Sequence, residues 1–145
     1  MLYRRAIDTD IPRLVEFRKT LLDHEDDKSL DDVFFGYFQS SLHDKSLVAW
    51  VAEDDGIVIS VVCLSICQLV PGFNNPSGKI AYMTTVYTIS EYRRRGIASN
   101  LIREAIDDVK TKGIKRILLH SSDMARSIYE NLGFAEGKNY FGLNL

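Results

Sequence analysis

The stretch Tyr92-Arg93-Arg94-Arg95-Gly96-Ile97-Ala98-Ser99 is the most informative segment of this 145-residue chain. It stands between a predicted strand over residues 80–89 and a predicted helix that begins near Gly96. The small residues Gly96 and Ala98 allow a ligand to approach the backbone closely. The first N–H groups of a helix have no acceptor within the helix, and the helix dipole adds partial positive charge. The segment therefore predicts a place for a pyrophosphate, with arginine side chains near further phosphate groups.

The same eight residues allow other interpretations. A solvated basic turn that caps a helix would use these residue types without any ligand. A nucleic-acid-binding domain is disfavoured, because no aromatic residues stand between the arginines and the formal net charge of the chain is −2. The phosphate-binding pattern GxxxxGKS/T is absent, which disfavours a nucleoside triphosphatase.

Hydrophobic patterns predict the elements on both sides of this segment. Further strands are predicted over residues 2–7, 47–52, 57–69, 115–120 and 139–145. Helical spacing predicts a helix after Thr9 and Asp10, with Pro12 in its first turn, and a second over residues 33–42. Another short helix, over residues 122–132, has Ser122 or Asp123 as its cap. The order β-α-α-β-β-β-α-β-α-β indicates one α+β domain over residues 1–145.

Apolar residues mark the two N-terminal helices. The spacing places the apolar residues of the first helix on one face, and they are Ile11, Leu14, Val15, Leu21 and Leu22. The second helix carries Val33, Phe34, Tyr37, Phe38 and Leu42.

Composition and the remaining residue types set the broad class. Hydrophobic residues make up 46% and charged residues 26%, as in ordinary globular domains. The N-terminus lacks a signal-peptide pattern, and no stretch reaches the ~20 apolar residues of a membrane helix. Cys63 and Cys67 lack metal-type spacing and are expected to be small core residues. We therefore expect a cytoplasmic protein without a metal or a membrane partner.

Two separated motifs resemble the GNAT (GCN5-related N-acetyltransferase) superfamily. Arg93-x-x-Gly96-x-Ala98 is similar to the acetyl-CoA signature of that family, Q/R-x-x-G-x-G/A. The segment from Leu119 to Phe134, with its ending Tyr129-Glu130-x-x-Gly133-Phe134, resembles the fifth strand and fourth helix of small bacterial members. The resemblance covers the whole chain. It implies a GNAT fold, with a central mixed, mostly antiparallel sheet of six to seven strands and about four helices.

The resemblance implies a site for acetyl-CoA as the acyl donor. In the family the fourth strand carries a bulge and separates from the fifth, so that its backbone pairs with the pantetheine arm. Plain strand packing is the alternative role for Val86 and Thr88. Ser122 stands where many relatives have Asn, and it keeps one donor with a shorter reach. The implied cofactor-binding residues are Val86, Tyr87, Thr88, Arg93, Arg94, Arg95, Gly96, Ile97, Ala98, Ser99 and Ser122.

Tyr129 corresponds to the family tyrosine near the coenzyme sulfur, and is the one catalytic residue that the resemblance implies. Its hydroxyl would protonate the departing thiolate, although a core tyrosine on an amphipathic helix fits the same spacing. Many relatives carry a glutamate on the fourth strand as general base, whereas residues 82–85 contain no carboxylate. The base stays open among Glu25, Asp26, Glu53, His120 and a water chain.

The implied reaction is transfer of an acetyl group from acetyl-CoA to a primary amine by direct attack. The acidic stretch from Asp23 to Asp32 borders the acceptor pocket in the family and would attract a cationic amine, although a solvated loop has the same composition. A polyamine, an amino acid, an aminoglycoside-like amine or a peptide N-terminus would each qualify. A non-catalytic CoA-binding regulatory module of the same fold is the alternative. Dimers are common in the family, so the resemblance also allows a homodimer.

Overall fold

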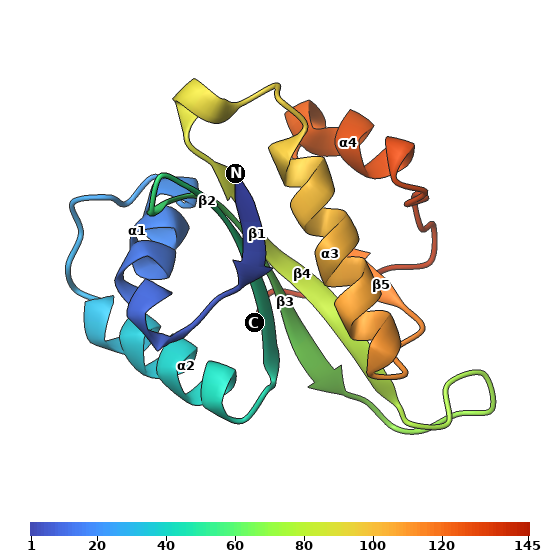
Figure 1. The fold of residues 1–145 in the computed structure, drawn as a ribbon. Helices are drawn as coiled ribbons and strands as arrows, with labels where there is room; N and C mark the ends of the chain where they lie inside the picture. The colour runs from blue at the N-terminus through green and yellow to red at the C-terminus, as the bar shows by residue number, and fades with distance from the viewer.

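Five strands form one sheet in the computed structural model, which describes residues 1–145 (Figure 1). The strands lie in the order of the chain: β1 (Leu2–Arg5), β2 (Leu47–Asp54), β3 (Ile57–Gln68), β4 (Lys79–Thr88) and β5 (Ile117–Leu119). The first four pair antiparallel, and β5 pairs parallel to β4. The expected α+β class and the mixed, mostly antiparallel sheet are confirmed.

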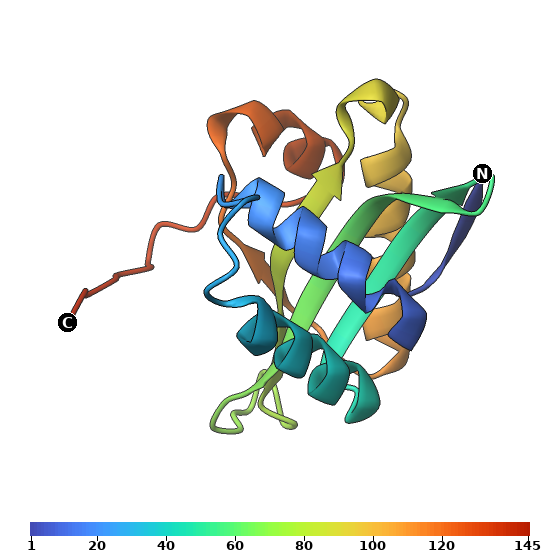
Figure 2. The same ribbon diagram turned by 90° about the vertical axis from the view of Figure 1, so that its left-hand side faces the viewer.

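Helices cover both faces of the sheet (Figures 1 and 2). The helices α1 (Ile11–Leu21) and α2 (Asp31–His43) lie on one face, and α3 (Ile97–Thr111) and α4 (Arg126–Asn131) lie on the other. Short 3₁₀ helices precede α1 (η1, Asp8–Asp10), α3 (η2, Ser90–Tyr92) and α4 (η3, Asp123–Ala125). None of the helices combines the length and the apolar composition needed to cross a bilayer.

Alternation along β3 divides the core into two buried clusters. Val62 and Leu64 pack toward α3 and α4, whereas Val61 and Cys63 pack toward α1 and α2, as expected for a strand covered on both faces. Cys63 is buried, as predicted for a small core residue, and burial raises the pKa of its thiol to about 12. Cys67 is only half-buried, and both cysteines are free.

The apolar face predicted for the first helix is only partly buried. Leu21 and Leu22 are 40% and 42% exposed, because α1 ends at Leu21 and an exposed loop follows it. Phe17, which the spacing did not select, is almost fully buried. In α2, Phe38 is buried and Phe34 and Leu42 pack against the same cluster, whereas Tyr37 is exposed and its hydroxyl hydrogen-bonds to Ser65 Oγ at 2.8 Å.

The chain does not form the predicted last strand over residues 139–145. The sheet ends at β5, so it has five strands instead of six or seven. The final residues have no regular structure and lead away from the body of the molecule (Figure 2). A strand needs a second strand for its backbone hydrogen bonds, and within one chain this segment pairs with none.

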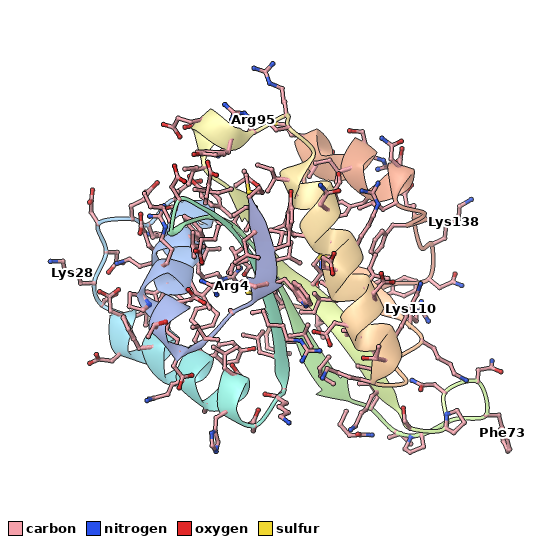
Figure 3. All side chains as sticks on the ribbon, viewed as in Figure 1. Arg4, Lys28, Phe73, Arg95, Lys110 and Lys138 are labelled. Atoms are coloured by element: carbon pink, nitrogen blue, oxygen red, sulfur yellow. The ribbon has the colours of Figure 1, made fainter.

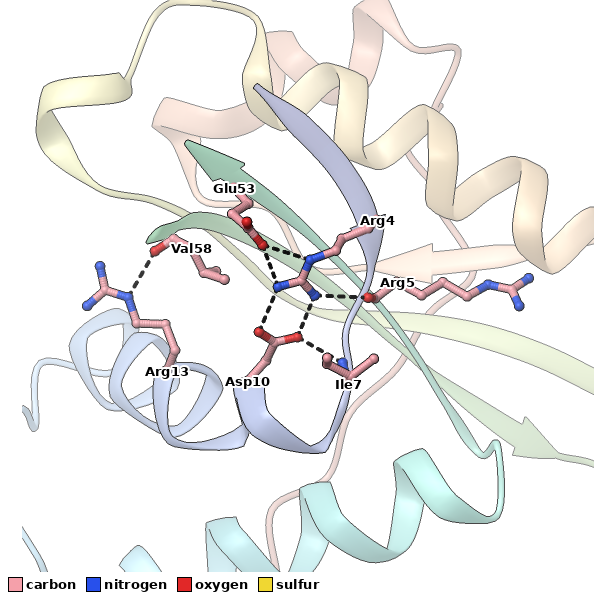
Figure 4. A network of polar contacts seen from close by, with 7 residues as sticks. All are labelled: Arg4, Arg5, Ile7, Asp10, Arg13, Glu53 and Val58. Atoms are coloured by element: carbon pink, nitrogen blue, oxygen red, sulfur yellow. Dashed lines mark hydrogen bonds and ion pairs between the residues drawn. The ribbon is translucent and has the colours of Figure 1, made fainter. Parts of the chain in front are cut away.

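A polar network joins the first strand to the start of α1 (Figure 4). The guanidinium of Arg4 donates to both carboxylate oxygens of Asp10, at 2.7 and 3.0 Å, and to Glu53 Oε2 at 2.8 Å. Asp10 precedes α1 as predicted, but its carboxylate accepts from the N–H of Ile7 at 2.8 Å and does not cap α1. Burial opposes ionisation of Asp10, yet the hydrogen bonds from Arg4 and Ile7 hold its pKa below the ordinary value.

A second network fixes α3 against the sheet. Arg5 donates to both carboxylate oxygens of Asp108 at 2.8 and 2.7 Å, and the indole N–H of Trp50 donates to the same carboxylate at 2.9 Å. Asp108 is buried in α3, whereas Arg5 and Trp50 come from β1 and β2. A buried carboxylate needs such partners. The network therefore sets the position of α3, and with it the position of the helix N-terminus.

Candidate active site

The strands β4 and β5 separate after a short contact. Their parallel pairing covers three residues and ends at Met83 opposite Leu119. On the other edge of β4, Met83 and Thr85 pair with consecutive residues of β3, which leaves Thr84 as an extra residue in a β-bulge. The bulge and the separation expected for the fourth strand are therefore both present, directly next to each other.

The backbone of β4 beyond the bulge faces the gap that β5 leaves. Ile89 N donates to Ile59 O of β3 at 3.1 Å. In an antiparallel strand the N–H and C=O groups of every second residue point to the same neighbour, so those of Tyr87 also point to β3. The N–H and C=O groups of Val86 and Thr88 then point away from β3, into the gap. Of the three predicted pantetheine positions, Val86 and Thr88 therefore direct their backbone into the gap, and Tyr87 directs its backbone to β3. The carbonyl of Thr88 is already occupied, because it accepts from Arg93 Nε.

The N-terminus of α3 is not capped by any side chain. Gly96 precedes the helix with a φ of +75°, and the first helical hydrogen bond runs from Asn100 N to Gly96 O. The N–H groups of residues 97–99 consequently have no acceptor within the helix. The first turn also contains no acidic residue, so the helix dipole is uncompensated. The predicted anion site on the backbone is geometrically available.

The three arginines lie on the exposed turn ahead of α3, where Figure 3 shows Arg95 projecting outward. Arg93 Nε donates to the carbonyl of Thr88 at 2.9 Å, so this residue ties the turn back to β4. Arg95 stacks over the ring of Tyr92, with 4.9 Å from the guanidinium carbon to the ring centroid. All three residues directly precede Gly96 and the N-terminus of α3.

Tyr129 lies on α4 and is 8% exposed. It packs in the cluster between α3 and the sheet, with its ring 5.8 Å from that of Phe134 and nearly perpendicular to it. Burial raises the pKa of the phenol, which therefore stays protonated at neutral pH. Ser122 Oγ accepts from Ala125 N at 3.3 Å, so Ser122 caps η3 as predicted and fixes the segment that leads into α4.

Among the base candidates, only His120 lies at the separation of the two strands. It directly follows Leu119, the last residue of β5. Its Nδ1 is hydrogen-bonded to the hydroxyl of Tyr82 on β4, and the ring of Tyr140 lies edge-on at 5.5 Å. Glu53 is instead held by Arg4. Glu25 and Asp26 lie on the exposed loop between α1 and α2.

Arg18 is a residue of the site that sequence reasoning missed. From α1 its Nη1 donates to the carbonyl of Thr84, the bulge residue, at 2.9 Å. This hydrogen bond satisfies a carbonyl that the bulge removes from the β3–β4 ladder. No local pattern around Arg18 indicates this role, because the contact depends on how α1 lies across the sheet.

Comparison with known proteins identifies the family. The chain belongs to the acetyltransferase (GNAT) family, whose model matches residues 11–134. A similar solved structure is that of a predicted acetyltransferase from Clostridium acetobutylicum, crystallised with acetyl-CoA. The two chains are 29% identical and superpose with a TM-score of 0.90. The match covers 99% of this chain and 95% of that chain.

Two curated relatives are named N-acetyltransferases. N-alpha-acetyltransferase 30 of Schizosaccharomyces pombe is 33% identical over 63 residues, which are 41% of this chain and 42% of that protein. N-acetyltransferase family 8 member 2 of Rattus norvegicus is 30% identical over 96 residues, which are 63% of this chain and 40% of that protein. The chain thus spans less than half the length of these two relatives.

Proposed function

We propose that this protein transfers the acetyl group of acetyl-CoA to a primary amine by direct attack in a ternary complex. The observation that carries the proposal is the uncapped N-terminus of α3 beside the open backbone of β4. An uncapped helix N-terminus binds phosphate groups, and an unpaired strand edge binds an extended chain that offers amide groups. Acetyl-CoA has both, as a pyrophosphate joined to a pantetheine arm.

These two features orient the donor. With the pyrophosphate on the N–H groups of residues 97–99, the arm would run along Val86 and Thr88 toward the bulge at Thr84. The thioester would then lie where β4 and β5 separate, beside His120. In this proposal the hydroxyl of Tyr129, on α4, would reach the same gap.

The reaction needs two proton transfers. The neutral amine attacks the thioester carbonyl carbon, a C–N bond forms, and the C–S bond breaks. The thiolate takes a proton from the Tyr129 hydroxyl, and the nitrogen loses a proton to a base. We assign this base to His120. If Nδ1–H donates to the Tyr82 hydroxyl, the lone pair of Nε2 is free to accept that proton.

We expect His120→Ala to lower the acetyl-transfer rate by roughly 10²-fold or more, with unchanged acetyl-CoA affinity. Tyr82→Phe should lower the rate less, because the imidazole of His120 remains and loses only the hydrogen bond that orients it. The measurement is kcat and KM with any active acceptor, together with the acetyl-CoA dissociation constant.

His43→Ala is the matched control for His120, because His43 is an exposed histidine at the end of α2. It should leave the rate unchanged. A near-normal rate in His120→Ala would show that another group or water acts as the base.

The charge of the loop between α1 and α2 bears on the class of acceptor. Residues 21–30 are exposed throughout, so the acidic stretch from Asp23 to Asp32 is accessible to a ligand. Lys19 neutralises Asp31 through an ion pair of 2.8 Å, while Glu25, Asp26 and Asp27 form no ion pair with a lysine or arginine. This excess of negative charge favours a cationic amine.

The test is an acceptor screen. The protein is mixed with acetyl-CoA and a polyamine, an amino acid, an aminoglycoside or a peptide with a free N-terminus, and thiol release is followed together with the mass of the product. We expect thiol release that depends on one of these amines. A non-catalytic CoA-binding module, which the missing carboxylate on β4 would favour, would bind acetyl-CoA without any amine-dependent thiol release.

A further inference from the structure

The helix α1 carries three basic residues, and only two of them have a carboxylate partner. Arg13 pairs with Glu16 at 2.7 Å, and Lys19 pairs with Asp31 at 2.8 Å. Arg18 is half-buried, and its hydrogen bonds go to a carbonyl and a hydroxyl instead of a carboxylate. A charge that is partly removed from water is stabilised by an opposite charge. Arg18 therefore lacks the counter-charge that its two neighbours on the helix have.

The guanidinium of Arg18 is held in place by one nitrogen while its other donors stay free. Its Nη1 donates to the carbonyl of Thr84, the bulge residue, at 2.9 Å and lies 3.5 Å from Thr85 Oγ1. Its Nε and Nη2 have no hydrogen-bond partner in the chain, and neither atom is sealed from solvent. A guanidinium has five N–H donors, so several remain available to a ligand at the bulge.

The position of these donors bears on the acceptor, and this step rests on the proposed function. That proposal places the thioester at the bulge, so the attacking nitrogen must come within about 3–3.5 Å of the thioester carbon there. The helix α4, with Tyr129, lies on the opposite face of the sheet from α1 (Figures 1 and 2). An anionic group close to the attacking nitrogen would then lie within reach of Arg18.

The chemistry of the free donors selects among the acceptors named above. Paired N–H groups of a guanidinium match the two oxygens of a carboxylate. Only an amino acid carries a carboxylate one carbon away from its amine. A polyamine and an aminoglycoside have no carboxylate, and the N-terminal residue of a peptide has an amide in that place.

The loop that follows α1 adds the opposite charge. The helix ends at Leu21, three residues after Arg18, and the exposed loop with Glu25, Asp26 and Asp27 begins there. Free positive donors at the bulge therefore lie beside a negatively charged loop. A substrate with an anionic and a cationic end fits both.

We propose that Arg18 binds the α-carboxylate of an amino acid whose α-amine is acetylated and whose cationic side chain extends toward the acidic loop. Arg18 is thus a residue that determines acceptor specificity. Its contact with the bulge fixes the carboxylate site at a constant distance from the place of attack.

The first test compares amino acids with their amides. L-lysine and L-arginine are offered beside L-lysinamide and L-argininamide, which keep the α-amine and the side chain but have no carboxylate. We expect kcat/KM to be roughly tenfold higher or more for each amino acid, because the hydrogen bonds between two charged groups are lost with the amide. Mass spectrometry of the product should place the acetyl group on the α-nitrogen.

Arg18→Gln tests the residue itself. The variant keeps an amide donor for the carbonyl of Thr84 but removes the charge. The preference for the amino acid over its amide should fall to about onefold, mainly through a higher KM for the amino acid, with unchanged acetyl-CoA affinity. Arg18→Lys restores the charge without the paired geometry and should recover part of the preference. A role in holding the bulge alone would lower kcat equally for amino acid and amide, and would leave the preference intact.

Arg13→Gln is the matched control on the same helix. Arg13 also donates to a main-chain carbonyl, that of Val58, at 3.0 Å, but its charge is already paired with Glu16. The control should keep the wild-type preference. Amides used as well as amino acids by the wild-type protein, or turnover only of a polyamine, an aminoglycoside or a peptide, would overturn the carboxylate site and leave acetyl transfer in place.

A binding measurement separates this inference from the proposed reaction. In titrations of the protein saturated with CoA, lysine or arginine should bind roughly tenfold more tightly or better than its amide, and no turnover is needed. Selective binding without any amine-dependent thiol release would refute acetyl transfer and support the carboxylate site. Equal binding of amino acid and amide, or binding of neither, would overturn the site.

Discussion

Replacement of Gly96 by tryptophan is expected to abolish acetyl-CoA binding, with a rise in the dissociation constant of ~100-fold or more. Gly96 is the residue immediately before α3, next to the N–H groups of residues 97–99. No other atom lies within 4 Å of a Cβ built at Gly96, so the new side chain finds space in the fold. That space is the one we assign to the pyrophosphate, and the indole would occupy it. Isothermal titration with acetyl-CoA measures the change.

Gly113→Trp is the matched control at the opposite end of the same helix. Gly113 has a φ of +74°, against +75° at Gly96, and its Cβ would likewise meet nothing within 4 Å. Both variants therefore carry the same left-handed backbone strain of about 1 kcal/mol. Their melting temperatures should fall together, whereas only Gly96→Trp should lose the ligand. Equal acetyl-CoA affinity in the two variants would remove the pyrophosphate from the N-terminus of α3.

The order of the elements could be predicted from the sequence because each carries its own periodic signal. The strand β3 and the helix α3 are long and strongly apolar on the expected positions, and both lie within a residue or two of the predicted bounds. The faces of α1 and α2 were less predictable. Exposure of Leu21 and Leu22 depends on where α1 ends relative to the sheet, which spacing along the chain does not encode.

The tail shows a different kind of failure. Its alternating residues do favour a strand, but a strand exists only where another strand accepts its hydrogen bonds. Local pattern cannot say whether that acceptor lies in the same chain. The structure leaves the tail unpaired, because no strand of the sheet accepts its hydrogen bonds.

The candidate site also has a part that the sequence predicts and a part that it does not. The segment from Tyr92 to Ser99 could be predicted, because small residues and arginines at a strand-to-helix junction suit the binding of phosphate groups. The bulge at Thr84 has no local signal and was expected only from the family resemblance. The contacts of Arg18 with the bulge and of Tyr82 with His120 could not be predicted, since they depend on helix placement and on the register of β4 and β5.

Tyr129→Phe is expected to lower kcat by roughly 10²–10⁴-fold while the fold and the acetyl-CoA affinity persist. Negative charge develops on sulfur as the C–S bond breaks, so a proton donor placed there stabilises the transition state more than the ground state. Burial raises the pKa of Tyr129, which keeps the phenol in the protonated form that a general acid requires. The ring remains in the variant, so its packing against Phe134 is preserved.

Tyr3→Phe is the control for the loss of a phenol hydroxyl. Tyr3 packs against the same core cluster from β1, at the opposite edge of the sheet, where its hydroxyl accepts from Asn100 Nδ2 at 3.2 Å. The control should keep kcat. In Tyr129→Phe the acetyl-CoA dissociation constant should change by less than about tenfold, because one neutral hydrogen bond contributes about 1 kcal/mol. A near-normal kcat would make Tyr129 a packing residue and leave protonation of the thiolate to water.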